Sequence, residues 1–313
     1  MVFHGLPLRA AAVMVVVGLA LVSARPAHGQ APVPTMVGVQ DLAWSADGQK
    51  LFFSAMRVKR DYSDYTPDKW SVYRYDVATG EVARVAASSF TVGASPIEPV
   101  IMVGKLVDGN RDLYLLDETG RERARLTTDS AEDFGGTWSP DGQSIAFTSK
   151  RGGRSEAFVA NRDGSNARRL VDAGDDRTYN PTWSPDGRHI AYYREKGDGQ
   201  DQIWVVRPDG SAPVNLTHDA FNNIYPGWTP DGRVVYGQTA RGAQARAFTV
   251  GIDGGEKRAL LEIQSFFTRF SADGSRIAWL EELPESGGIG VIVGDRDGRV
   301  LARVPLEAVG TSP

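Results

Sequence analysis

The sequence predicts an all-β protein, a six-bladed β-propeller with four-stranded antiparallel blades. Three observations lead to this prediction. A turn motif of the form Trp-Ser-Pro-Asp-Gly recurs along the chain, a second series of turn glycines recurs with a similar period, and no segment beyond the N-terminal apolar run shows a helical stripe of apolar residues. The 313 residues, 41% of them apolar, can bury a core of this size.

The turn motif is clearest in three copies, which begin at Trp138, Trp183 and Trp228. Weaker copies begin at Trp44 and Phe270. Successive glycines are 45, 45 and 42 residues apart in the last four copies, at Gly142, Gly187, Gly232 and Gly274. Gly48 precedes Gly142 by 94 residues, which leaves room for one degraded copy, Ala94-Ser95-Pro96-Ile97-Glu98.

A second series of glycines gives the same count. Each follows a β-rich run, and the spacings are 40, 44, 46, 44 and 44 residues for Gly80, Gly120, Gly164, Gly210, Gly254 and Gly298. Two independent markers therefore indicate six repeats.

The third repeat shows the four strands of a blade most clearly. Its short β-branched or aromatic runs lie between Gly, Pro, Asp and Asn residues, as strands require: 136–139, 144–149, 156–160 and 167–171. The proline and glycine of the motif suit a tight turn between the first and second strands. We expect the motif tryptophan to pack between neighbouring blades, because it offers a large apolar contact.

The N-terminus predicts export. Arg9 precedes an uncharged run, Ala10–Ala24, and small residues follow, so we interpret residues 1–29 as a signal peptide. The alternative is an uncleaved anchor, although fifteen helical residues span only about 22 Å of a hydrocarbon core of about 30 Å. We expect residues 30–36 to form a linker or a clasp strand against blade six, 37–306 the propeller and 307–313 a tail.

The repeat resembles a known family. The pattern Trp-Ser-Pro-Asp-Gly-x-x-Ile-Ala-Phe, followed by a third strand, an Asp-Gly turn and Arg-x-Leu-Thr, is seen with small departures in Trp138–Val171 and Trp183–Thr217. It resembles the TolB-type, WD40-like (PD40-type) propeller repeat over about residues 37–305. The resemblance implies the fold, while function depends on individual sites. TolB carries an α/β domain ahead of its propeller, and here the first repeat begins about fifteen residues after the proposed cleavage site, so we expect that domain to be absent.

Composition excludes several functions. The formal net charge of -4 is unlike that of a nucleic-acid binder, and the absence of cysteine removes disulfides and thiolate sites. Beyond the leader only His189 and His218 remain, in different repeats, and no Gly-x-Ser-x-Gly motif occurs. We therefore predict no catalytic residues, no metal ligands and no cofactor. Asp295-Arg296-Asp297-Gly298 is interpreted as a hairpin turn, with an axial calcium or water cluster as the alternative.

Topology sorts the connections onto two faces. Turns joining first to second and third to fourth strands form one face, here called the tight-turn face. Loops joining second to third strands, and one blade to the next, form the loop face, where partner binding is expected. The longest such loop, residues 57–70, interleaves aromatic and charged residues, and we select Tyr62, Tyr65 and Trp70 as candidate partner contacts. The alternative is a solvated insertion in which Trp70 begins a strand.

The connections between blades carry acids and amides followed by an aromatic residue. This pattern predicts an acidic channel mouth rimmed by aromatic side chains. The candidate partner-binding residues here are Asp133, Phe134, Asp176, Tyr179, Asn222, Tyr225 and Phe267. The alternative is that these aromatics cap the core between blades and the acids only solubilise. Basic residues are expected farther from the axis, at Lys150, Arg151, Arg154, Lys196 and Arg241.

Together these features predict an exported, periplasmic protein-binding scaffold, an accessory subunit docked on an envelope or membrane protein complex. A protein partner is expected, with no nucleic acid and no membrane span once the leader is cleaved. The alternative is a ligand-, glycan- or metal-binding propeller.

Overall fold

The structure is a computed structural model that describes residues 33–196, 200–239 and 244–310. The chain divides into two compact units, Met1–Pro32 and Val33–Pro313, and every described residue lies in the second. The proposed leader, Gln30–Pro32 and Arg241 therefore lie outside the described residues. Among the residues described, no helix has the length and apolar character needed to cross a membrane.

The second unit is built from six four-stranded antiparallel sheets, as predicted. Blades one and two consist of β1 (Thr35–Trp44), β2 (Lys50–Lys59), β3 (Ser71–Asp76), β4 (Val82–Ala87), and β5 (Ser89–Ala94), β6 (Val100–Val107), β7 (Asn110–Asp117), β8 (Glu122–Arg125). Blades three and four consist of β9 (Asp133–Trp138), β10 (Ser144–Ser149), β11 (Glu156–Asn161), β12 (Arg168–Arg169), and β13 (Arg177–Trp183), β14 (Ile190–Glu195), β15 (Gln202–Val206), β16 (Val214–Asn215). Blades five and six consist of β17 (Asn222–Trp228), β18 (Val234–Thr239), β19 (Arg246–Val250), β20 (Arg258–Gln264), and β21 (Thr268–Phe270), β22 (Arg276–Leu283), β23 (Gly288–Asp295), β24 (Val300–Arg303).

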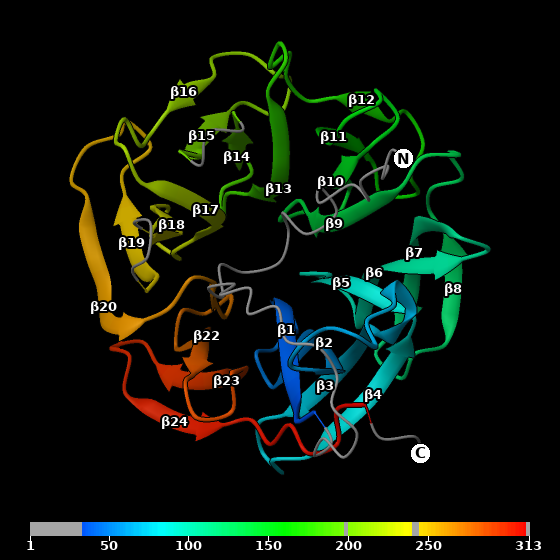
Figure 1. The fold of residues 1–313 in the computed structure, drawn as a ribbon. Helices are drawn as coiled ribbons and strands as arrows, with labels where there is room; N and C mark the ends of the chain where they lie inside the picture. The colour runs from blue at the N-terminus through cyan, green and yellow to red at the C-terminus, as the bar shows by residue number, and fades with distance from the viewer. Residues whose placement is uncertain (1–32, 197–199, 240–243, 311–313) are drawn as a thin grey trace, which may run out of the picture. The chain divides into compact units, whose positions relative to one another are not determined.

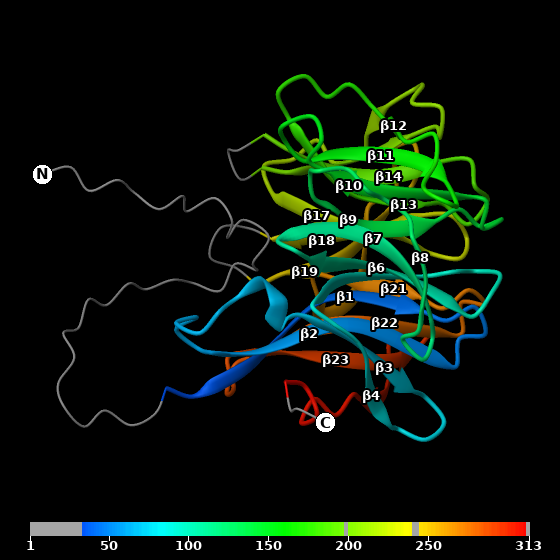
Figure 2. The same ribbon diagram turned by 90° about the vertical axis from the view of Figure 1, so that its right-hand side faces the viewer.

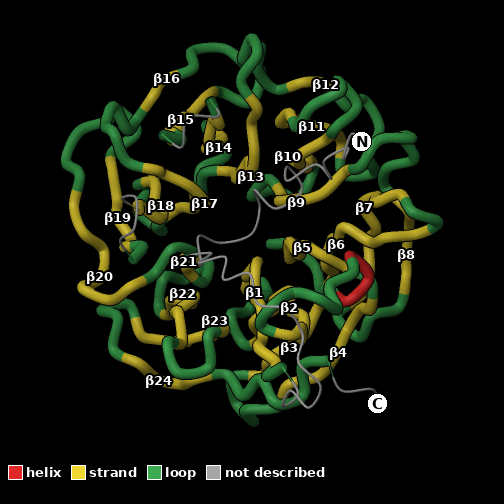
Figure 3. The backbone as a smooth tube through the Cα atoms, in the orientation of Figure 1, coloured by secondary structure: helices red, strands yellow, loops and turns green. Residues whose placement is uncertain are grey.

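The blades surround a central axis, with the first strand of each blade innermost and the fourth outermost (Figure 1). The described residues are otherwise loops and turns, apart from the short 3-10 helix η1 (Pro67–Lys69) in the blade-one loop (Figure 3). Seen from the side, that loop projects from one face and the β3–β4 turn from the other (Figure 2). The two faces predicted from strand order are therefore distinct.

The turn motif works as the sequence predicts. In blade three the Ser139 hydroxyl donates to Asp141 Oδ1 (2.6 Å), which also accepts from the Gln143 amide (3.0 Å). Gly142 has a φ of 65°, a left-handed conformation that glycine adopts at low steric cost. In the degraded copy of blade two, Ile97 packs onto Gly142 of the next blade.

Three motif tryptophans join neighbouring blades, as expected. Their indole N–H groups donate to a carbonyl of the preceding blade: Trp138 to Gly93 (3.2 Å), Trp228 to Thr182 (2.9 Å) and, across the chain ends, Trp44 to Arg269 (3.1 Å). Trp183 differs, because its indole nitrogen is buried and finds no hydrogen-bond partner within the described part of the chain.

This difference predicts unequal costs for two matched substitutions. Trp138→Phe removes an indole hydrogen bond and leaves the Gly93 carbonyl without that donor, whereas Trp183→Phe removes a donor that has no acceptor. We expect Trp138→Phe to lower the free energy of unfolding by roughly 1–2 kcal/mol more than Trp183→Phe. Urea unfolding of both variants measures the difference, and equal losses would contradict the assignment.

The inner strands of blades one to five each contain a register irregularity. It falls between Val39 and Asp41 in β1, and between Ile224 and Gly227 in β17. Such bulges re-aim the side chains that follow them. In β17 the bulge places Tyr225 at a φ of 55°, a left-handed conformation uncommon for a bulky residue.

The ring closes without strand exchange, since every blade is formed by four consecutive strands. The segment after β24 instead docks on blade one. Arg57 Nε donates to the Val309 carbonyl (2.7 Å) and its Nη2 to the Leu306 carbonyl (3.0 Å). The Gly310 amide donates to the Tyr73 hydroxyl (3.0 Å), and Val309 is fully buried.

The expected clasp strand is wrong for the described part of residues 30–36. Thr35, Met36 and Val37 pair with Lys59, Val58 and Arg57 of the same blade, and not with the edge of blade six. The reason is that β2 extends as far as β1, so these residues continue an existing ladder. The propeller therefore begins at Thr35, two residues before the predicted boundary.

Candidate functional site: the loop face and channel mouth

The predicted rim aromatics and their ring neighbours form a mostly buried belt beside the channel mouth. The ring centroids of Trp70 and Phe90 lie 5.2 Å apart, those of Tyr179 and Tyr193 5.2 Å, and those of Tyr225 and Phe267 5.3 Å. We call the whole set the aromatic belt: Trp70, Phe90, Phe134, Tyr179, Tyr193, Tyr225, Phe266 and Phe267.

Burial favours a packing role for most of this belt. Phe134 and Tyr179 are each 8% exposed, Tyr225 5% and Phe267 1%. Trp70 is buried and directly precedes β3, as the alternative interpretation of that residue expected. The belt thus caps the core between blades and supports the mouth, so its direct contact with a partner stays a proposal.

The acids at the mouth are paired with cations instead of forming an acidic centre. Asp133 Oδ2 lies 3.0 Å from Arg151 Nη2, and Asp176 Oδ2 lies 3.1 Å from Arg194 Nη2. Asp133 is fully buried, and this burial raises the pKa of its carboxyl group. The expected separation of acidic centre from basic periphery is therefore wrong at Asp133, because Arg151, which was expected farther from the axis, reaches its carboxylate.

The blade-one loop holds its tyrosines in place through polar contacts. Asp64 Oδ2 lies 2.5 Å from Lys69 Nζ, and Asp64 Oδ1 accepts from the Lys59 amide (2.8 Å). These hydrogen bonds, that from Lys69 first, lower the pKa of Asp64. Tyr62 and Tyr65 remain only half-buried on this frame. The loop is also tied to blade six, since Arg60 Nη2 donates to the Glu285 carbonyl (2.9 Å).

The connection between blades four and five presents an aromatic side chain that the sequence-based reasoning passed over. Phe221 is 41% exposed, and Lys257 Nζ lies 5.7 Å from its ring centre. Asp219 anchors this connection by accepting from Lys257 Nζ (2.9 Å) and Asn223 Nδ2 (2.8 Å). The predicted contact residue Asn222 accepts from the Asp201 amide (3.3 Å), so it helps to hold the same connection. The sequence does hold a signal for this exposed aromatic residue, because Phe221 is an apolar residue between the loop residues Asp219 and Asn222.

The channel holds a polar cluster that sequence reasoning also missed. Asp41 accepts from the Leu42 amide (3.0 Å) and from the Val92 amide (3.2 Å) of the next blade. Across the channel, Gln40 Nε2 donates to the Tyr225 hydroxyl (3.5 Å). Arg269 from blade six stacks its guanidinium 4.0 Å from the centre of the Phe267 ring.

Burial dominates the electrostatics of this channel cluster. It raises the pKa of Asp41 to about 6, although Arg269 opposes the shift, and it lowers the pKa of Arg269 to about 10. It also raises the pKa of Tyr225 to about 12. In the described ranges, no three His, Cys, Asp or Glu side chains gather in a way that would hold a metal ion.

These features define the class: a six-bladed β-propeller with a polar channel and a loop-bearing face around its mouth. The family model described as the TolB β-propeller domain (PD40) matches residues 39–198, and the chain belongs to this family. A TolB homolog of Chlorobium chlorochromatii (strain CaD3) is 33% identical over 115 residues, which are 35% of this chain and 23% of that relative.

Solved structures show the same fold. The structure of a putative TolB from Agrobacterium tumefaciens matches with a TM-score of 0.61 at 23% identity, covering 87% of this chain and 92% of that one. TolB from Acinetobacter baumannii matches with a TM-score of 0.57 at 22% identity, covering 70% of this chain and 53% of that one. The match thus spans about a quarter of the curated relative and about half of the latter protein.

Proposed function

We propose that this chain is an exported, periplasmic protein-binding scaffold that acts by binding rather than by catalysis. It serves as an accessory subunit of an envelope or membrane protein complex, and its partner contacts the loop face around the channel mouth. Membership in the TolB propeller family supports a binding role, and the predicted leader supports export.

One observation carries this proposal: the loop face presents aromatic side chains on a frame that is already ordered. Tyr62 and Tyr65 are half-exposed on a loop fixed by the Asp64–Lys69 pair, and Phe221 is exposed on a connection fixed by Asp219. Aromatic anchors dominate the energy of protein interfaces, and ordering them in advance lowers the entropic cost of binding. These side chains therefore suit the centre of an interface.

Site-specific photocrosslinking in the native envelope tests the proposal. A photoreactive phenylalanine analogue is placed at Tyr65 or Phe221, with Thr79 as the control position, because Thr79 lies in a tight turn of the same blade as Tyr65 on the opposite face. We expect one protein adduct common to positions 65 and 221, and none at 79. Tyr65→Ala should weaken capture of that protein by roughly tenfold or more if Tyr65 is an anchor. Adducts at 79 alone, or none at 65 and 221, would contradict loop-face docking.

A further inference from the structure

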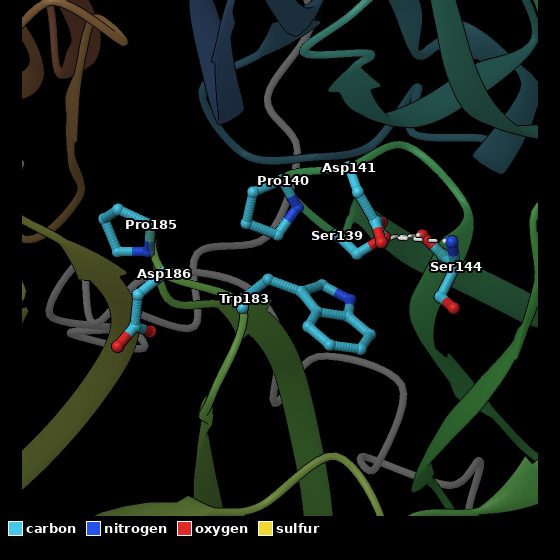
Figure 4. Close-up of a pocket in the computed structure, with 8 residues that line it drawn as sticks. Ser139, Pro140, Asp141, Ser144, Trp183, Pro185 and Asp186 are labelled. Atoms are coloured by element: carbon cyan, nitrogen blue, oxygen red, sulfur yellow. Dashed lines mark hydrogen bonds between the residues drawn. The ribbon is translucent and has the colours of Figure 1, made fainter.

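A cavity lies on the tight-turn face, between blades three and four. It has a volume of about 250 Å³ and is lined by both turn motifs, including Asp141 and Ser144 of blade three and Trp183, Asp186 and Gly187 of blade four. Figure 4 shows the Trp183 indole ring between the motif residues of the two blades. This is the seam at which the motif tryptophan donates no hydrogen bond to a described residue.

The residues that line the cavity include two carboxylates and no cationic side chain. Asp141 and Asp186 are both exposed, and within the described residues neither forms an ion pair. Hydrogen bonds from Ser139 and Ser184 respectively, and then from backbone amides, lower the pKa of each, so both are ionised at neutral pH. Two carboxylates at the rim of a cavity that an indole ring helps to line favour the binding of a cation.

Another seam of the same propeller shows which cation this geometry accepts. Arg276 of blade six occupies the motif position that Ser144 occupies in blade three, and its amide makes the same hydrogen bond to the motif serine. Its side chain crosses to blade one, where Nη1 donates to the Gly48 carbonyl (2.5 Å). Gly48 is the equivalent of Gly187 in the cavity. A guanidinium group therefore fills one seam, and the short Ser144 leaves the equivalent space open in the other.

We propose that the cavity between blades three and four binds an arginine side chain from an extended segment of a partner protein. The guanidinium stacks against Trp183 and donates to the carbonyl of Gly187, as Arg276 does to that of Gly48. The carboxylates of Asp141 and Asp186, on either side of the cavity, supply the charge that attracts it. A guanidinium suits this role better than an ammonium, because it is planar, more weakly hydrated and carries five donors in a fixed arrangement. The site lies on the face opposite the proposed docking surface and is independent of it.

Binding of short peptides to the full chain tests the proposal. The probe is a blocked Gly-Arg-Gly peptide, compared with Gly-Lys-Gly and with the uncharged isostere Gly-citrulline-Gly. The readout is the indole N–H resonance of Trp183, assigned through Trp183→Phe. We expect the arginine peptide to shift this resonance in a saturable manner with a millimolar dissociation constant, the lysine peptide to bind more weakly, and the citrulline peptide to leave it unchanged.

Two variants locate the site. Ser144→Arg supplies the chain's own guanidinium and should abolish peptide binding without loss of thermal stability, since Arg276 occupies the same backbone position. Asp141→Asn with Asp186→Asn keeps the turn acceptors and should weaken binding by about tenfold or more. Asp231→Asn, in the equivalent turn of blade five, is the matched control and should bind normally.

Any of the following results would overturn the proposal. The first is an unshifted Trp183 resonance at saturating arginine peptide. The second is equal binding of the citrulline peptide, which would remove the role of charge. The third is unchanged affinity in Ser144→Arg, or an equal loss in Asp231→Asn, which would place binding elsewhere.

Discussion

Arg57→Ala is expected to lower the free energy of unfolding by about 3 kcal/mol, which for a protein of this size corresponds to a fall in Tm of roughly 6–10 °C. Arg57 is the main link between blade one and the segment that follows blade six, through its bonds to the Val309 and Leu306 carbonyls. Hydrogen bonds from a charged donor are worth more than neutral ones. Their loss also frees Val309, which is fully buried in the closed ring.

Calorimetry of the full chain measures this effect, and two variants sharpen it. Arg57→Lys keeps the charge but cannot reproduce a bond from Nε together with bonds from Nη2, so its Tm should fall between those of wild type and Arg57→Ala. Arg296→Ala is the control, because the Arg296 side chain is 78% exposed. A Tm unchanged by Arg57→Ala would mean that the terminal segment contributes nothing to ring closure.

The fold could be predicted because its markers are local. The six copies counted from Gly142 and its equivalents, and again from Gly164 and its equivalents, correspond to six blades, and both series adopt positive φ. Each of these glycines reports a turn that involves only a few neighbouring residues, so one sequence suffices to find it. The inter-blade position of Trp138 followed from the same repeat.

The site was only partly predictable, for a physical reason. Which way a side chain of an inner strand points depends on a register of period two, and the bulges in these strands change that register by one residue. The sequence located Phe134 and Tyr179 beside the channel but could not show that they are buried. The bulges carry no consistent residue, since equivalent positions hold Asp41 and Tyr225.

Ring closure was not predictable either. Arg57 binds main-chain carbonyls about 250 residues away in sequence, and any residue supplies a carbonyl, so the contact leaves no complementary side chain to recognise.

The cavity at Trp183 could not be predicted from the sequence for a related reason. The motif is intact in blades three and four, and nothing in it shows that the short Ser144 leaves open a space that Arg276 fills at another seam.

Asp41→Asn is expected to change how stability depends on pH. Burial raises the pKa of Asp41 to about 6 in the folded chain, well above the ordinary value near 4 of the unfolded chain. Below pH 4 both states hold the proton. As pH rises from about 4 to about 6, the unfolded state releases this proton while the folded state keeps it. The free energy of unfolding therefore falls by about 3 kcal/mol over this range. Asparagine resembles the protonated carboxyl group and should abolish this loss.

The difference between the two proteins isolates Asp41 from every other titrating group. Urea midpoints at pH 4, 5, 6 and 7 should show the free energy of unfolding of Asp41→Asn rising relative to wild type by up to about 3 kcal/mol between the first and last values. Any constant cost of replacing an acceptor of the Val92 amide cancels in this comparison. Asp297→Asn, whose side chain is 85% exposed, serves as the control and should run parallel to wild type.

Parallel curves for Asp41→Asn would show that the channel holds its carboxylate at no cost. A confirmed cost, in contrast, would mean that this chain keeps a charge in its channel at the expense of stability, as proteins do where a residue serves binding.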